Sequence, residues 1–203
     1  MSRAHPTEEE FEDLLLACRY GDLEDVKAFV QQYGVEAVQN ARDERGNTVL
    51  HMCCGNGHAE LLEYLLSILP ASAVQTTNES QSPPLHWAIL NSHLNCVKIL
   101  VESPEEKGGG MPLLNQTNAS GRDAFHESVW LGEGREEVAG WIEGFIVKVE
   151  GPDVEGTADA EKKREVLGQK VEEYEQQDQV DEDTKGDKQD VQEVVQQAEK
   201  LEL

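Results

Sequence analysis

Five of the six histidines recur at two positions of a repeating pattern, and histidine is the side chain best suited to acid–base and metal chemistry near neutral pH. His51, His86 and His126 each follow an apolar residue in the same local context, at spacings of 35 and 40 residues. His58 and His93 share a second position of the pattern. Because they recur with the repeat instead of gathering in one cluster, we expect these histidines to maintain the fold.

No other group of residues has the spacing of a known catalytic or metal site. The chain holds no glycine-rich phosphate loop and no nucleophile elbow. Cys18, Cys53, Cys54 and Cys96 lack metal-ligand spacing, and we expect all four to be reduced cysteines of a cytosolic or nuclear protein. Carboxylates are plentiful, but none is paired with a pocket that would tune its pKa. We therefore expect no enzymatic activity, no cofactor and no bound metal.

The histidines lie in a repeated pair of helices. The segment 48–51 (Thr-Val-Leu-His) recurs as 83–86 (Pro-Pro-Leu-His) and, degraded, as 123–126 (Asp-Ala-Phe-His). In each copy a turn follows, and then a second helix with apolar residues at i, i+3, i+4 and i+7. A Thr-Pro-Leu-His signature near a 33-residue period is typical of ankyrin repeats. The sequence thus predicts an all-α ankyrin-repeat solenoid.

We expect four repeats in a domain over 1–149, of which the first and the last are degenerate because each has one face in water. Their approximate ranges are 10–42, 43–77, 78–117 and 118–149. The turns between paired helices are predicted at 21–22, 57–58, 92–93 and 132–133. The Thr48 hydroxyl is predicted to contact the His51 imidazole. The segment 103–116, which contains three consecutive glycines and two prolines, is predicted to be a flexible surface excursion.

The composition changes after residue 149. Residues 150–203 are rich in Glu, Gln, Asp and Lys, and we expect an acidic, largely disordered tail. Amphipathic helical periodicity appears near 161–175 and 187–203. Three interpretations of these segments stay open: docking on the end of the solenoid, folding on a partner, or a marginal helix in water.

The formal net charge is −24. Residues 150–203 hold 18 acidic and 7 basic side chains, a net −11, which leaves −13 for residues 1–149. Such a field repels nucleic acid and anionic membranes and attracts cationic partners, although solubility alone would also explain it. No apolar stretch approaches the roughly 20 residues that span a membrane. We therefore expect a cationic protein partner, no direct nucleic-acid binding and no membrane association.

A partner is expected on the concave face, which the loop tips and first helices of such a solenoid line. The candidate residues are Arg19, Tyr20, Asp43, Glu44, Asn56, Glu79, Leu90, Asn91, Trp130 and Leu131. Trp130 is the strongest single candidate, because a buried tryptophan often dominates the energetics of an interface. The alternative for Trp130 is a place in the capping core of the degenerate fourth repeat.

The order of these elements resembles the fungal ankyrin-repeat chaperones dedicated to one ribosomal protein, the KH-domain protein of the small-subunit head (small-subunit protein number three). The resemblance runs through the degenerate first repeat at 17–23, the turn and helix at 46–52, the motif at 85–88 and the acidic tail that ends at 198–201. Ser92 in place of a turn glycine and the glycine-rich segment after Pro104 depart from the pattern.

The resemblance implies a chaperone that binds the newly made basic protein, keeps it soluble and escorts it to assembling small subunits, in cytoplasm and nucleus. An import receptor is a further candidate partner, in a ternary complex. Two other functions stay open from the residues alone. One is an ankyrin adaptor or inhibitor of a signalling or transcription protein, and the other is an acidic histone chaperone.

Overall fold

The computed structural model describes residues 5–130 and 134–150. The chain divides into two units, Met1–Gly151 and Pro152–Leu203, and the described residues all belong to the first. The helical segments expected near 161–175 and 187–203 lie outside them.

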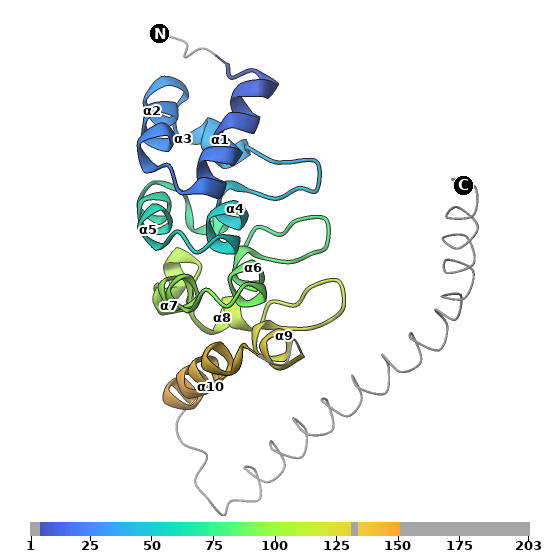
Figure 1. Ribbon diagram of the computed structural model, residues 1–203. Helices are drawn as coiled ribbons and strands as arrows, with labels where there is room; N and C mark the ends of the chain where they lie inside the picture. The colour runs from blue at the N-terminus through green and yellow to red at the C-terminus, as the bar shows by residue number, and fades with distance from the viewer. Residues whose placement is uncertain (1–4, 131–133, 151–203) are drawn as a thin grey trace, which may run out of the picture. The chain divides into compact units, whose positions relative to one another are not determined.

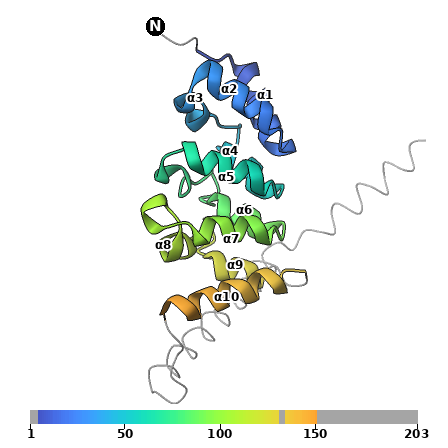
Figure 2. The same ribbon diagram turned by 90° about the vertical axis from the view of Figure 1, so that its left-hand side faces the viewer.

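Four antiparallel helix pairs form the described unit (Figure 1). Their bounds are α1 (Glu8–Tyr20) with α2 (Leu23–Tyr33), α4 (Val49–Gly55) with α5 (Ala59–Ile68), α6 (Pro84–Leu90) with α7 (Leu94–Glu102), and α9 (Ala124–Trp130) with α10 (Glu136–Glu150). The first helices pack in the order α1, α4, α6, α9, and the second helices form an adjacent layer (Figure 2). The predicted all-helical solenoid is confirmed.

The core follows the periodic positions of the sequence. Leu50 and Leu85, at the same place in successive first helices, are fully buried, and Leu14 is nearly so. Leu62 and Leu65 of α5 are also fully buried, so both layers contribute to one continuous apolar core. Each fully buried leucine contributes about 1.5–3 kcal/mol relative to an exposed one.

The start of α4 shows how the recurring motif builds a helix. The Thr48 hydroxyl accepts hydrogen bonds from the backbone N–H groups of Leu50 (3.1 Å) and His51 (3.4 Å). His51 Nδ1 in turn accepts the Thr48 backbone N–H at 3.1 Å and lies 3.0 Å from its hydroxyl oxygen. The predicted contact between the two side chains is confirmed, and it satisfies donors that a helix N-terminus otherwise leaves unpaired.

The His51 ring also joins two repeats. Because Nδ1 accepts, Nε2 carries the proton, and it donates to the Ser82 carbonyl at 2.9 Å. His51 is fully buried, and this burial lowers its pKa to about 4, so the ring is neutral at physiological pH. His86 occupies the same position and is equally buried. The residue equivalent to Thr48 is there Pro83, which offers no hydroxyl. His51 therefore serves the fold, as predicted.

Gly57 stands in the turn between the paired helices of the second repeat. It has φ +80°, and a Cβ there would lie 2.6 Å from His93 Nδ1, so both backbone and space require glycine. Ser92 has the same left-handed conformation, φ +59°. In the last pair this conformation falls on Gly134, followed by Arg135, two residues later than the turn predicted at 132–133.

Short helical segments follow the second helices of the first three pairs: α3 (Val35–Asn40), the 3-10 turn Ala71–Ala73, and a second 3-10 turn Glu105–Lys107 with α8 (Gly110–Leu114). The prediction of a flexible excursion at 103–116 is wrong. Leu113 and Leu114 are buried, and a Cβ on Gly109 would collide with the carbonyl oxygens of Ser103 (2.2 Å) and Leu100 (2.5 Å). Gly109 therefore permits a tight packing of this backbone against the end of helix α7.

Candidate partner-binding surface

One face of the unit is formed by the first helices α1, α4, α6 and α9 together with three hairpin loops, 41–48, 74–83 and 115–123 (Figure 1). The exposed side chains of these helices and loops make up its surface. We call it the first-helix face. The loops project to the same side of the column of first helices. Side chains that are far apart in the sequence therefore meet on a common surface.

The three loops repeat one turn. The side-chain oxygen of Asp43 accepts the backbone N–H groups of Arg45 (2.9 Å) and Asn47 (2.8 Å). Asn78 and Asn118 make the same two bonds in their own loops. Such side-chain-to-backbone turns fix a loop that has no helix or sheet to hold it.

Backbone hydrogen bonds join neighbouring loops. The Glu79 N–H donates to the Arg45 carbonyl at 3.0 Å, and the Ala119 N–H donates to the Ser80 carbonyl at 2.9 Å. The Asn78 side-chain amide adds a bond to Asn47 Oδ1 at 2.8 Å. The three tips are thus held in one row.

The ends of the first helices are fixed by side chains of the following repeat. His58 Nε2 lies 2.8 Å from the Arg19 carbonyl, and His93 Nε2 lies 3.2 Å from the Gly55 carbonyl. In the last pair Arg135 takes this role and donates from Nη2 to the Leu90 carbonyl at 2.7 Å. These bonds satisfy carbonyls that a helix C-terminus leaves unpaired, and they hold in place the candidate residues that stand there.

Seven of the ten residues predicted to bind a partner are exposed on the first-helix face: Arg19, Tyr20, Glu44, Asn56, Glu79, Asn91 and Trp130. Leu90 is half-buried. Asp43 is half-buried, and both its carboxylate oxygens are engaged in its own loop, the second by the Asn47 side-chain amide at 2.8 Å. Leu131 lies outside the described residues. Asp43 therefore shapes the surface that Glu44 presents.

A series of polar contacts, which the repeat pattern did not predict, supports Trp130. The Arg122 guanidinium lies over the indole ring, 5.2 Å from its centroid. Arg122 Nε donates to the buried Glu127 carboxylate at 2.7 Å, and the Asn118 side-chain amide donates to the same oxygen at 3.0 Å. Trp130 is 41% exposed, so one part of the ring is supported and the rest is open to a partner.

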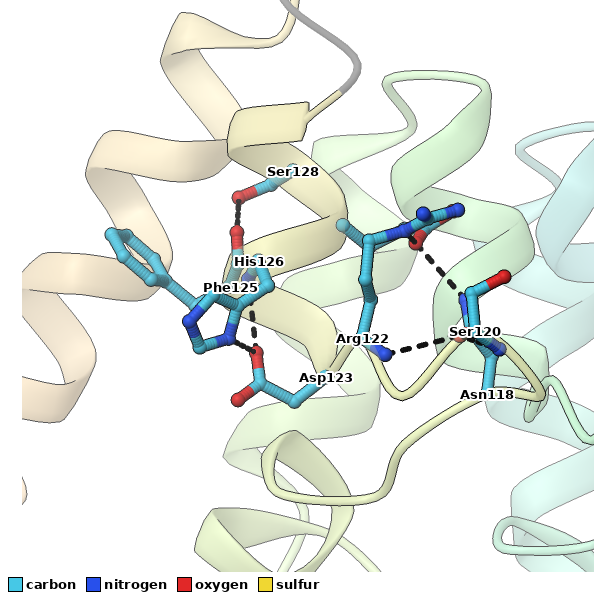
Figure 3. Close-up of polar contacts among 8 residues, drawn as sticks. Asn118, Ser120, Arg122, Asp123, Phe125, His126 and Ser128 are labelled. Carbon is cyan, nitrogen blue, oxygen red and sulfur yellow. Dashed lines mark hydrogen bonds and ion pairs between the residues drawn. The ribbon is translucent and has the colours of Figure 1, made fainter. Parts of the chain in front are cut away.

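The start of α9 is fixed beside this chain of contacts. Figure 3 shows the Asp123 carboxylate directed at His126, which it meets both at Nδ1 (2.7 Å) and at the backbone N–H (2.9 Å). Burial raises the pKa of Asp123, but the bonds from His126 outweigh it and hold the pKa below its usual value. Asp123 stands where Thr48 stands in the second repeat, so a carboxylate replaces a hydroxyl in the same capping role.

The cysteines and the other possible metal ligands form no reactive or metal-binding site among the described residues. All four cysteines are free and buried, and burial raises the pKa of Cys18 to about 12 and that of Cys96 to about 11, so both remain thiols. Over residues 5–130 and 134–150, no three His, Cys, Asp or Glu side chains gather as a metal site. Within the same part of the chain no helix combines the length and apolarity that crossing a membrane requires.

Comparison with known proteins agrees with this geometry. The family model for ankyrin repeats (three copies) matches residues 14–109, which run from the second half of α1 past the end of α7. Among curated proteins, mouse (Mus musculus) synphilin-1 is 38% identical over 63 residues, 31% of this chain and 6% of that protein. The putative palmitoyltransferase ZDHHC13 of zebrafish (Danio rerio) is 33% identical over 94 residues, 46% of this chain and 14% of that protein. These matches span only a small part of either relative.

Among solved structures, the chain is similar to a chain in the crystal structure of the yeast ribosomal protein Rps3 in complex with its chaperone Yar1. The TM-score is 0.58 at 29% sequence identity, and the match covers 67% of this chain and 92% of that chain. The resemblance expected from the sequence is thereby confirmed. The described part of this chain is an all-helical solenoid of ankyrin repeats.

Proposed function

We propose that this protein is a dedicated, non-enzymatic chaperone. It binds a newly made, basic ribosomal protein of the small subunit, the KH-domain protein of the subunit head. It keeps this guest soluble and escorts it to assembling subunits.

One observation carries the proposal: the similarity to a chain in the complex of Rps3 with its chaperone Yar1, which covers 92% of that chain. A match over 67% of this chain is far longer than a single repeat. Because the described residues form helical repeats, this chain corresponds to the chaperone of that pair. The curated relatives share at most a small part of their length with it, and they favour no other function.

Charge supports the same proposal. Ribosomal proteins are basic because they neutralise RNA phosphates, and residues 1–149 carry a net −13. Exposed carboxylates stand at the loop tips, at Glu44 and Glu79. Long-range attraction would bring the guest to this face and compete with non-specific RNA, without direct binding of nucleic acid by the chaperone.

On the first-helix face, aromatic and apolar side chains would add short-range contacts. Tyr20, 69% exposed, stands at one end of the row of first helices, and Trp130 stands at the other, with the half-buried Leu90 between them. The remaining candidates, Arg19, Asn56 and Asn91, supply polar groups along the same row. This arrangement of aromatic anchors within a polar surround is common at protein interfaces.

An escort of this kind works in both cytoplasm and nucleus, and we include an import receptor as a third component of the complex. Release would follow from transfer of the guest to its RNA.

Co-purification of the full chain with the KH-domain ribosomal protein tests the proposal. We expect a soluble complex of about 1:1 stoichiometry by size-exclusion chromatography with light scattering, and no aggregation of the guest at low salt. A glutamate-rich polypeptide of equal net charge controls for charge alone. A guest that precipitates equally with and without the chain would exclude the chaperone. Preferential binding of core histones in direct competition would favour a histone chaperone instead.

A further inference from the structure

A groove of about 440 Å³ opens between α1 and α2. Its lining joins exposed apolar side chains with a carboxylate rim. We propose that this groove is a docking site for a basic, amphipathic peptide segment, whose apolar side chains enter the groove while its Lys and Arg side chains meet the rim.

The apolar part of the groove is more exposed than the equivalent positions of the next two repeats. Leu16 of α1 is 46% exposed and Tyr20 is 69% exposed, whereas Met52 and Trp87, which occupy the position of Leu16 in the next two repeats, are half-buried. Phe29 of α2 lines the opposite wall. An apolar surface open on two facing helices suits an amphipathic segment laid between them.

The rim is negative throughout. Glu10, Asp13, Asp22 and Asp25 line the groove, and no basic side chain is among its lining residues. Hydrogen bonds from the Thr7 backbone and the Tyr33 hydroxyl hold the pKa of Glu10 below its usual value, so this carboxylate is ionised at neutral pH. Asp25 also lies in the first turn of α2, where its negative charge interacts favourably with the helix dipole. Asp13 lies within α1 and makes no such interaction.

Charge selects among the possible occupants. A second copy of this chain carries −24 and would be repelled by the rim. The tail of this chain, with 18 acidic and 7 basic residues over 150–203, has the same sign as the rim. A segment rich in Lys and Arg is the complementary partner, and it would reduce the mutual repulsion of four carboxylates. That the segment belongs to the basic ribosomal guest rests on the proposed function above.

A designed helical peptide with leucines at i, i+3, i+4 and i+7 and lysines elsewhere tests the groove directly. A peptide of equal composition but scrambled order controls for charge. By fluorescence anisotropy with the full chain, we expect the amphipathic peptide to bind at least tenfold more tightly than the scrambled one. The double variants Leu16→Ser with Tyr20→Ser, and Asp13→Lys with Asp25→Lys, should each weaken its binding at least tenfold.

Matched controls lie elsewhere on the same unit. Val147→Ser with Val149→Ser changes an equally exposed apolar pair of α10, and Glu63→Lys with Glu102→Lys makes the same charge change on α5 and α7. Both should leave peptide binding within twofold. Failure of the wild-type chain to bind the amphipathic peptide, or equal losses in groove and control variants, would overturn the docking site.

The ribosomal guest is then tested separately with the same variants. A photo-crosslinking residue at position 20 should attach to a basic, amphipathic stretch of the guest, and the groove variants should weaken guest capture. Peptide binding without guest capture would contradict the proposed function and leave the groove standing. If wild type and groove variants capture the guest equally, the guest does not bind in the groove.

Discussion

The Arg122 guanidinium lies over the indole ring of Trp130, and its Nε donates a hydrogen bond to the buried carboxylate of Glu127. The ring is therefore supported before any partner arrives. A side chain that is already ordered loses less conformational entropy on binding than a free one, by about 0.5–1.5 kcal/mol.

We expect Trp130→Ala to weaken guest binding about 30-fold, corresponding to the roughly 2 kcal/mol that defines a hot-spot residue. Isothermal titration calorimetry measures the affinity, and circular dichroism checks that helix content is unchanged. Val147→Ala, which alters an exposed apolar side chain of α10 outside the first-helix face, is the matched control and should bind normally. Unchanged affinity, or loss of helical signal, would each contradict the assignment of Trp130 as an anchor.

Glu127→Ala should destabilise the unit by about 1–3 kcal/mol, because it leaves the Arg122 and Asn118 donors without their acceptor in a buried place. Glu127→Gln keeps an acceptor oxygen and should cost less. Urea unfolding followed by circular dichroism gives both values. Glu137→Ala, an exposed glutamate of α10, serves as control. Equal stability of the Ala variant and the wild type would show that the carboxylate does not hold this cluster.

Stability should fall between about pH 6.5 and pH 4 because of His51. Its pKa is lowered to about 4 in the folded state by burial, against 6.5 in the unfolded chain. The unfolded chain therefore binds the additional proton in this window, so the stabilisation is complete above pH 6.5 and is lost as the pH falls. The total is about 3 kcal/mol.

The comparison of urea unfolding at pH 7 and pH 5 for wild type and His51→Gln isolates this contribution. The variant is less stable at neutral pH, because Gln cannot reproduce both ring hydrogen bonds. It should nevertheless lose less free energy of unfolding than the wild type as the pH is lowered. Parallel losses in the two proteins would assign the pH dependence to other groups.

Leu85→Asp should destabilise the unit by several kcal/mol, because it places an unpaired charge where the native side chain is fully buried. Thermal unfolding would show a large drop in the midpoint. Leu85→Met, which nearly conserves volume, should cost less than about 1.5 kcal/mol. An aspartate variant with wild-type stability would place position 85 outside the core.

Charge reversal at the loop tips, Glu44→Lys with Glu79→Lys, should slow guest capture and flatten its salt dependence. Both side chains are exposed, so the fold should be unaffected. For the wild type, association should weaken as salt rises, because exposed charges are screened beyond about 8 Å at physiological ionic strength. Stopped-flow association rates at several salt concentrations provide the test. Capture that is fast and insensitive to salt in both proteins would refute electrostatic steering by the tips.

The helix pairs, the buried leucines and the Thr48–His51 contact could be predicted because they repeat. A position that recurs with the same residue type shows its role by comparison with its copies. Leu50 and Leu85 are recognised in this way, and so is His51, whose recurrence indicates a ring that maintains the fold.

What does not repeat was missed. Helix α8 has only five residues and includes two positions, Gly110 and Pro112, that usually disfavour helices. Its stability comes from Leu113 and Leu114 packing on the core and from the close approach of Gly109 to α7, which are tertiary effects. The cluster of Arg122, Glu127 and Trp130 occurs once among the described repeats, so none of them offers a copy against which to recognise it. In the last pair, Arg135 stands at the turn position that His58 and His93 occupy in the two preceding pairs. The turn lies two residues later than the sequence pattern predicts, so this equivalence was not recognised.

The row of hairpin tips has a consequence for how this surface can change over evolution. The links between tips run from the Glu79 N–H to the Arg45 carbonyl and from the Ala119 N–H to the Ser80 carbonyl, so they use only main-chain atoms. Any residue except proline at the donor positions could make them. Substitutions at the tips can therefore adapt the surface to changes in the sequence of a partner, while the spacing between neighbouring tips stays constant.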